Sequence, residues 1–386
     1  MFMASFGMII PELPGYLTLM GAGHLLGYII GLFTLGALVS RFFSGKIADR
    51  AGRRVVMIIG TTVTAIAGFI YVLVGYIHNS SDFDIESGML GVWLFLGLRF
   101  FHGLSTGFRP AGSSALLTDI VPVDRRGEAL GYLGVAGNAG MAGGPAIGSL
   151  LAVECGYDSM FICSSLIGIA ALLLTLRLPE TLPNSRPIKR SDLNIFKGKN
   201  FERAAWPAAL SLLPVACAFG VFLTITPDFV EDLGYKYKGL FNTIIVIASI
   251  LMRFVAGKAS DKYGREPILA IGGVFLFIGM GILSYSTTQL AAAIGGVIYG
   301  LSIGINMPTI FAWTADLAPK GKIALAIGTT LVALEIGIGF GAFVSGSLFS
   351  SDFSWLPWLY RFCAISGMIM AIVLIYSKRK SVTTMN

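Results

Sequence analysis

Four ionisable side chains stand inside long apolar stretches of this chain: Glu12, Arg99, His102 and Glu335. A charge at the centre of a lipid layer costs about 2.5–3.5 kcal/mol on insertion scales, so it is usually retained for a function. A carboxyl group in a dry setting is easier to protonate than one in water, so Glu12 and Glu335 are suited to carry a proton. These residue types predict proton movement or recognition of a polar ligand.

The local sequence around each residue adds detail. Glu12 lies in P-E-L-P, where two prolines leave backbone carbonyls unpaired and predict an irregular segment suited to lining a cavity. Arg99 and His102 are three residues apart, which places them on one helix face. Three alternatives are structural: Glu335 pairs with Arg99, Glu12 sits at the outer water boundary, and His102 bonds a backbone carbonyl.

The composition identifies the surroundings of these residues as lipid. Of 386 residues, 55% are hydrophobic and only 13% are charged, with a mean hydropathy of +0.78. Soluble domains carry roughly a quarter charged residues, so this chain could not cover its surface in water. We expect an all-α membrane protein that contacts the lipid bilayer.

Stretches of about 20 apolar residues predict twelve transmembrane helices in two sets of six. The expected spans are 1–18, 24–44, 54–77, 89–109, 128–152, 158–177, 205–227, 239–256, 267–286, 289–314, 323–350 and 357–376. A polar connector at 178–204 separates a first bundle, 1–177, from a second bundle, 205–386. The abrupt apolar start before Pro11 predicts that part of the natural N-terminus is missing.

Lysine and arginine gather in alternate loops, which hold 24 of the 28 basic residues. This asymmetry predicts a multi-pass protein of the cell membrane with both termini in the cytoplasm. It also accounts for the net charge of +7, so no nucleic-acid partner is expected.

A charged hinge occurs twice, at 40–54 and again 212 positions later at 252–266. Gly52 and Gly264 are expected to reverse the chain between helices. Arg53 is expected to pair with Asp119, and Arg265 with Asp316. Asp49 and Asp261 would face the positive N-termini of the eleventh and fifth helices. We interpret these six charged residues as a cytoplasmic gate; the alternative is that they only set topology and turns.

A second sequence repeat has an offset of 197 residues, so that Asp119, Gly140 and Gly144 recur as Asp316, Gly337 and Gly341. At the same offset, Asn138 is the equivalent of Glu335. The fifth predicted helix carries a glycine–proline series, which allows close backbone approach. Its members are Gly131, Gly140, Gly144, Pro145 and Gly148, followed by Ser149. Such a series either lets the two halves close tightly or serves ordinary helix packing.

These motifs resemble those of a known family. The segment G-K-I-A-D-R-A-G-R-R at 45–54 resembles the G-x-x-x-D-R-x-G-R-[KR] loop of the major facilitator superfamily. The segment from Arg99 to Gly103 is similar to its R-x-x-x-G pattern. The glycine–proline series resembles the motif of the drug/proton antiporter branch, with Ser149 where a second glycine is usual.

The resemblance implies two pseudo-symmetric bundles around a cavity lined by the first, fourth and eleventh helices, including Glu12, Arg99, His102 and Glu335. Asn138 of the fifth helix is a further candidate for this cavity. It implies a monomeric secondary transporter that works by alternating access, here a proton-coupled exporter of amphipathic small molecules. The alternatives are a proton-symport importer of a sugar, organic acid or other metabolite, and a receptor or scaffold on the same fold. The sequence has no phosphate-binding loop and no metal-ligand spacing, so neither an enzyme nor a cofactor is expected.

Overall fold

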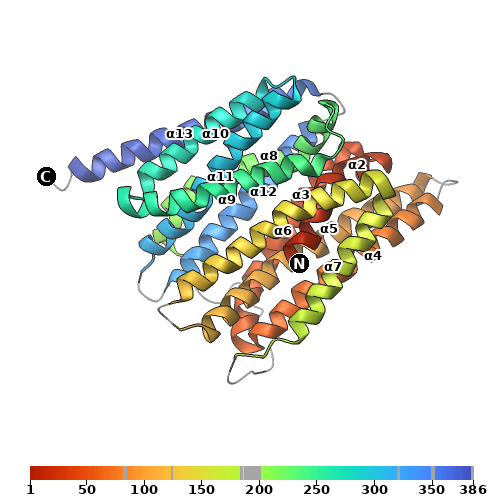
Figure 1. Cartoon of the computed structure of the whole chain (residues 1–386), viewed down its shortest axis with the longest axis horizontal. Coiled ribbons are helices and arrows are strands. Elements are labelled where there is room, and N and C mark those ends of the chain that lie inside the picture. Colours follow the sequence, from red (N-terminus) through yellow and green to blue (C-terminus); the bar gives the residue numbers. More distant parts are fainter. Residues whose placement is uncertain are drawn as a thin grey trace. The chain divides into compact units, whose positions relative to one another are not determined.

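The computed structural model describes residues 1–80, 85–122, 125–182, 186, 201–319, 322–348 and 353–383. Within these ranges the secondary structure is helical throughout (Figure 1). The first segment is broken into α1 (Phe2–Ile9), a 3-10 turn (Ile10–Glu12) and α2 (Leu13–Leu19). The interruption lies at P-E-L-P, as the two prolines predict, because neither ring nitrogen donates a backbone hydrogen bond.

Eleven long helices follow in the described residues. They are α3 (Leu26–Arg50), α4 (Arg53–Ser80), α5 (Ile85–Ile120), α6 (Arg126–Cys155), α7 (Tyr157–Leu176), α8 (Trp206–Asp232), α9 (Lys238–Tyr263), α10 (Arg265–Ser284), α11 (Gln289–Leu317), α12 (Ile323–Leu348) and α13 (Leu356–Thr383). Ten helices of the described chain are long and apolar enough to cross a membrane. The broken first segment and the glycine-rich α6 are the two predicted spans outside that set.

Several helices extend well past the predicted apolar spans. Helix α3 was expected to end near residue 44 but continues to Arg50, and α5 continues to Ile120 rather than 109. The hinge is therefore mostly helix, and Ala51 with Gly52 makes the turn. A polar helical extension outside the lipid lowers hydropathy without breaking the helix, so hydropathy alone places these ends too early.

The chain divides into two compact units. The first contains Met1–Gly198 with Tyr237–Gly239, and the second contains Lys199–Lys236 with Leu240–Asn386. Most of the predicted connector at 178–204 lies outside the described residues, so its bounds remain a prediction.

One close helix pair recurs in each unit. In the first unit α6 packs against α1, and in the second α12 packs against α8. A Cβ on Gly140 would lie 2.8 Å from the backbone nitrogen of Ala4, and one on its equivalent Gly337 would lie 2.5 Å from the Cβ of Ala216. The repeated glycines of the sequence therefore occupy equivalent packing positions.

Candidate functional site

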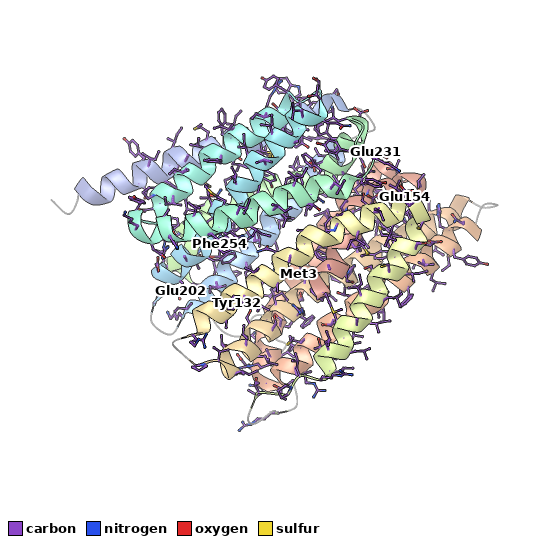
Figure 2. The ribbon with its side chains drawn as sticks, viewed as in Figure 1. Met3, Tyr132, Glu154, Glu202, Glu231 and Phe254 are labelled. Carbon is purple, nitrogen blue, oxygen red and sulfur yellow. The ribbon has the colours of Figure 1, made fainter. Side chains whose placement is uncertain are left out.

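The candidate site of the first unit begins with the seam between α1 and α6. Gly140, Gly144 and Gly148 each bring α6 against the backbone of α1, near Ala4 and Met8. Met3 of α1 also borders Gly140, and Figure 2 labels it. In contrast, a Cβ on Gly131 would meet no atom of the described residues within 4 Å. Three of the four glycines thus serve helix packing inside one unit, and their predicted part in closing the two halves remains a prediction.

This seam brings Ser149 to Glu12. The Ser149 hydroxyl donates a hydrogen bond to Oε1 of Glu12, and the two residues are 0% and 2% exposed. Ser149 occupies the position where the antiporter motif usually has glycine. The departure from the motif therefore provides a buried donor to a buried carboxyl group. A hydrogen bond of this kind orients the carboxyl group and offsets part of its desolvation cost.

Arg99 and His102 share a buried aromatic setting with Tyr71. Arg99 Nε donates to the carbonyl of Ile29 at 3.1 Å, and Nη1 lies 3.4 Å from the Tyr71 hydroxyl. That hydroxyl is also 3.5 Å from Nδ1 of His102. The guanidinium group stacks 4.6 Å from the ring centroid of Phe33, a favourable cation–π contact.

Two nitrogen atoms of this cluster have unused hydrogen-bonding capacity. Nη2 of Arg99 and Nε2 of His102 are buried without a hydrogen-bond partner in the described part of the chain. Both residues are almost fully buried, at 0% and 1% exposure. A buried polar atom without a partner is costly, so these atoms are suited to a transient partner, such as a water, a proton or a ligand group.

Among the described residues of the second unit, one carboxyl group is buried. Glu335 lies in the middle of α12 and is 6% exposed. It is two residues before Gly337, at the seam with α8. The structural alternative, in which Glu335 pairs with Arg99, would need a contact between the two units and stays a prediction. Asn138, its sequence equivalent on α6, is half-buried.

Sequence reasoning missed two participants. Tyr71 joins Arg99 to His102, but a tyrosine inside an apolar span carries no distinguishing signal. Ser149 was visible as a departure from a motif, without any indication of its partner.

The first hinge contains the ion pair that the sequence predicts. Arg53 Nε lies 3.2 Å from Oδ2 of Asp119, and Nη1 lies 2.5 Å from Oδ1 of Asp49. One guanidinium group thus joins the end of α3 to the end of α5. Asp49 is 73% exposed. Exposed pairs of this kind contribute about 0–1 kcal/mol to stability, so their value lies in fixing geometry.

The second hinge reproduces this arrangement. Arg265 Nε lies 2.7 Å from Oδ2 of Asp316, and Nη1 lies 2.5 Å from Oδ1 of Asp261. Gly52 and Gly264 have φ angles of +132° and +93°, the left-handed region that favours glycine. The predicted pairs and turns are confirmed in both halves. We predict that Asp49 and Asp261 face helix N-termini of the opposite unit, and this stays a prediction.

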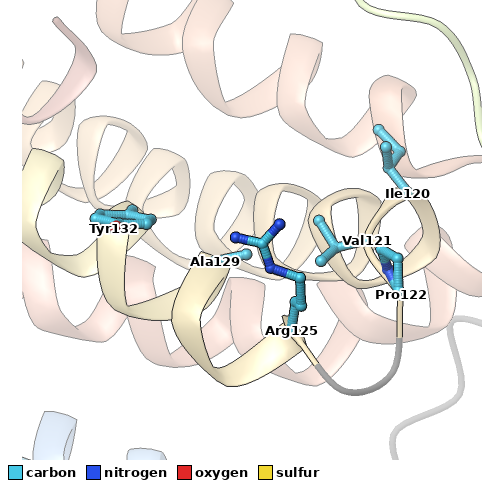
Figure 3. Close-up of a pocket in the computed structure, with 6 residues that line it drawn as sticks. All are labelled: Ile120, Val121, Pro122, Arg125, Ala129 and Tyr132. Atoms are coloured by element: carbon cyan, nitrogen blue, oxygen red, sulfur yellow. The ribbon is translucent and has the colours of Figure 1, made fainter.

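A separate surface pocket of about 300 Å³ lies where α5 turns into α6 (Figure 3). Its lining is mostly apolar, with Arg125 as the charged member: Ile120, Val121, Pro122, Arg125, Ala129 and Tyr132. None of the buried ionisable residues described above contributes to it. We therefore place the candidate site at the buried groups rather than at this pocket.

Long apolar helices, a duplicated hinge and buried ionisable residues together define a membrane transporter built from two helical units. The chain matches the family model described as Major Facilitator Superfamily over residues 1–328 and again over 237–384. The protein belongs to the major facilitator superfamily, whose members carry small molecules across membranes.

Similar proteins include drug exporters. The chain is 25% identical over 365 residues to a protein of Lactococcus lactis named multi-drug resistance efflux pump PmrA homolog, covering 89% of this chain and 84% of that one. It is 27% identical over 326 residues to multidrug resistance protein MdtG of Serratia proteamaculans, covering 80% and 74%. These relatives, like the similar structures, are transporters rather than enzymes.

Among solved structures, a D-xylose-proton symporter superposes with a TM-score of 0.75 at 17% identity. The match covers 97% of this chain and 94% of the symporter. At this identity the likeness shows the fold alone, which is the two-bundle all-α fold that the sequence predicts.

Proposed function

We propose that the protein is a proton-coupled exporter of small amphipathic compounds, acting as a monomer by alternating access. The observation that carries this proposal is a buried carboxyl group in each unit, Glu12 at 2% and Glu335 at 6% exposure. An ionised carboxylate is expensive in such a position, so binding a proton and binding a substrate become alternatives for the same group.

Each acid would have a defined part. Glu12 sits where the first segment is interrupted, and Ser149 holds its carboxyl group. The interrupted segment leaves backbone groups that need partners, which is tolerated in a membrane where the chain lines a water-filled cavity. Glu335 would bind the proton on one side of the membrane and release it on the other. Arg99 and His102 would bind the substrate or the proton through Nη2 and Nε2, the nitrogen atoms without a hydrogen-bond partner in the described residues.

Export is favoured by two observations. The relatives at 25% and 27% identity are named for multidrug efflux and multidrug resistance, and the glycine–proline series of α6 resembles the antiporter motif. The orientation with both termini in the cytoplasm is supported by the basic residues of alternate loops. In that orientation both hinges face the cytoplasm and would act as the gate on that side.

The test uses everted membrane vesicles that contain the overproduced protein and carry an imposed pH gradient, acidic inside. A panel of fluorescent amphipathic cations serves as the probe. An exporter driven by protons accumulates one or more of these dyes inside the vesicles, and a protonophore abolishes the accumulation. Vesicles containing the Asp49→Asn variant serve as the matched control.

The result that would overturn the proposal is gradient-driven movement of a sugar or organic acid in the same direction as the protons. Such movement identifies the importer instead. Dye accumulation that persists with the protonophore would contradict proton coupling.

A further inference from the structure

A carboxylate from the segment after α7 binds the first hinge. Glu180 Oε1 accepts a hydrogen bond from the backbone N–H of Arg53 at 2.9 Å, and Oε2 accepts one from the backbone N–H of Arg54 at 3.0 Å. These are the first two amides of α4, which have no partner within the helix. An anion at a helix N-terminus also interacts favourably with the helix dipole. Glu180 is therefore a cap supplied from 126 residues away.

The same segment also contacts the gate charges. The Thr181 hydroxyl donates to Oδ2 of Asp119 at 2.8 Å, the oxygen that faces Nε of Arg53. Further along, the backbone N–H of Arg186 donates to the carbonyl of Arg50 at 2.7 Å. Hydrogen bonds of Glu180, Thr181 and Arg186 thus attach the beginning of the connection between the two units to the end of α3, the start of α4 and the end of α5.

Gly52 makes room for this carboxylate. A Cβ at position 52 would lie 2.7 Å from Cδ of Glu180, so a side chain there would displace the carboxylate. At Gly264 in the second hinge, a Cβ would meet, among the described residues, only Cδ of Pro267 at 3.8 Å. The φ angle calls for glycine at both positions, but the close approach of a carboxylate is particular to the first.

The second hinge lacks the cap in the described residues. There, no side-chain carboxylate accepts from the backbone amides of Arg265 or Glu266, the first two of α10. The two hinges share their arginine–aspartate pairs, yet among the described residues only the first is bound to the segment that follows its bundle. The duplicated motif therefore does not account for Glu180.

We propose that Glu180 is a positioning residue of the cytoplasmic gate, which caps α4 and holds Arg53 between Asp49 and Asp119. Glu180 acts through Arg53 rather than on the substrate. Because Glu180 belongs to the connection between the units, displacement of that connection changes the geometry of the gate. The gating part of this inference rests on the proposed transport function, whereas the cap does not.

The cap is tested by hydrogen exchange on the full-length protein in lipid nanodiscs. Glu180→Gln removes the charge and one of the two acceptors, and Glu180→Ala removes both. Loss of a helix cap raises local opening by roughly fivefold, so amide exchange at residues 53–56 should be about fivefold faster in Glu180→Ala. Glu266→Gln, which removes an acid from the first turn of α10, is the matched control and should leave exchange at residues 53–56 unchanged.

Gly52→Ala provides a second variant, because the added methyl group displaces the carboxylate. Combining it with Glu180→Ala should raise exchange by less than the two single changes added together, since both remove the same contact and the double variant adds only the backbone strain of alanine at φ +132°. Unchanged exchange at 53–56 in Glu180→Ala, or fully additive effects in the double variant, would overturn the cap.

The gating part is tested by transport kinetics in the same preparations. Glu180→Gln should lower the maximal rate at unchanged KM and unchanged abundance, because the binding site is intact and the gate is mispositioned. Asp119→Asn should show a non-additive effect with Glu180→Gln. Wild-type kinetics in Glu180→Gln would overturn the gating role while leaving the proposed function standing. A wild-type protein that transports none of the dyes would contradict the proposed function, and the exchange experiment would still decide the cap.

Discussion

Replacing Gly144 by alanine should loosen the seam between α1 and α6. The new Cβ would lie 2.5 Å from the carbonyl oxygen of Ala4, and 3.1 Å from its carbonyl carbon and its Cα. Ordinary contact begins at 3.4 Å, so the helices must separate locally by the difference, 3.4 − 2.5 = 0.9 Å. The obstructing atoms are backbone, which no rotamer change moves aside. Overpacking of this kind costs about 1–3 kcal/mol.

The same separation should weaken the hydrogen bond from Ser149 to Glu12, because Ser149 lies on α6 just beyond the displaced position. We therefore expect Gly144→Ala to lower the thermal unfolding temperature by about 2–10 °C and to impair gradient-driven transport. Both are measured on detergent-purified and reconstituted protein.

Gly143→Ala is the matched control, since a Cβ at that neighbouring position meets nothing within 4 Å. This variant should be as stable as the wild type or slightly more so, because alanine favours a helix over glycine. Equal unfolding temperatures for Gly144→Ala and the wild type would refute the close approach of α1 and α6.

Three further predictions concern the gate and the second unit. Asp49→Asn should abolish transport at near-normal abundance, with partial recovery in Asp49→Glu. Transport at the wild-type rate in Asp49→Asn would mean that the hinge serves only as a turn. Arg265→Lys should slow transport, because a single ammonium group cannot reproduce the two-pronged contact with Asp261 and Asp316; its stability should stay within about 1 kcal/mol of the wild type, and a larger loss would contradict the exposed character of these pairs. Thr226→Val should destabilise the protein by about 1–3 kcal/mol in thermal unfolding, because the buried Tyr360 hydroxyl loses its 2.7 Å partner. Thr224→Val, whose hydroxyl bonds only the Gly220 carbonyl one turn back, should cost less, and equal losses would argue against the inter-helix bond.

Much of the architecture follows from local sequence. Apolar length predicts the spanning segments, and repetition of the hinge predicts the pairs of Arg53 with Asp119 and Arg265 with Asp316. The P-E-L-P sequence predicts the break in the first segment. These features depend on residues whose local chemistry decides the outcome.

Other features depend on which distant segments meet, and local pattern does not reveal that. The bond between Ser149 and Glu12 needs the close approach of α6 to α1. The cap at α4 needs Glu180 to fold back over the hinge. The ends of α3 and α5 were placed too early, because charged residues there extend the helix beyond the apolar span rather than ending it.

The central claim is that a buried carboxyl group couples proton movement to transport. The most direct measurement is uphill dye accumulation in proteoliposomes with an imposed pH gradient, comparing the wild type with Glu335→Gln and Glu12→Gln. Glutamine mimics the protonated carboxyl group and cannot release a proton. We predict that Glu335→Gln loses uphill accumulation, keeps downhill exchange, and binds dye independently of pH. If Glu335→Gln retains uphill transport and Glu12→Gln loses it, the proton role belongs to Glu12. Retained uphill transport in both variants would contradict the claim.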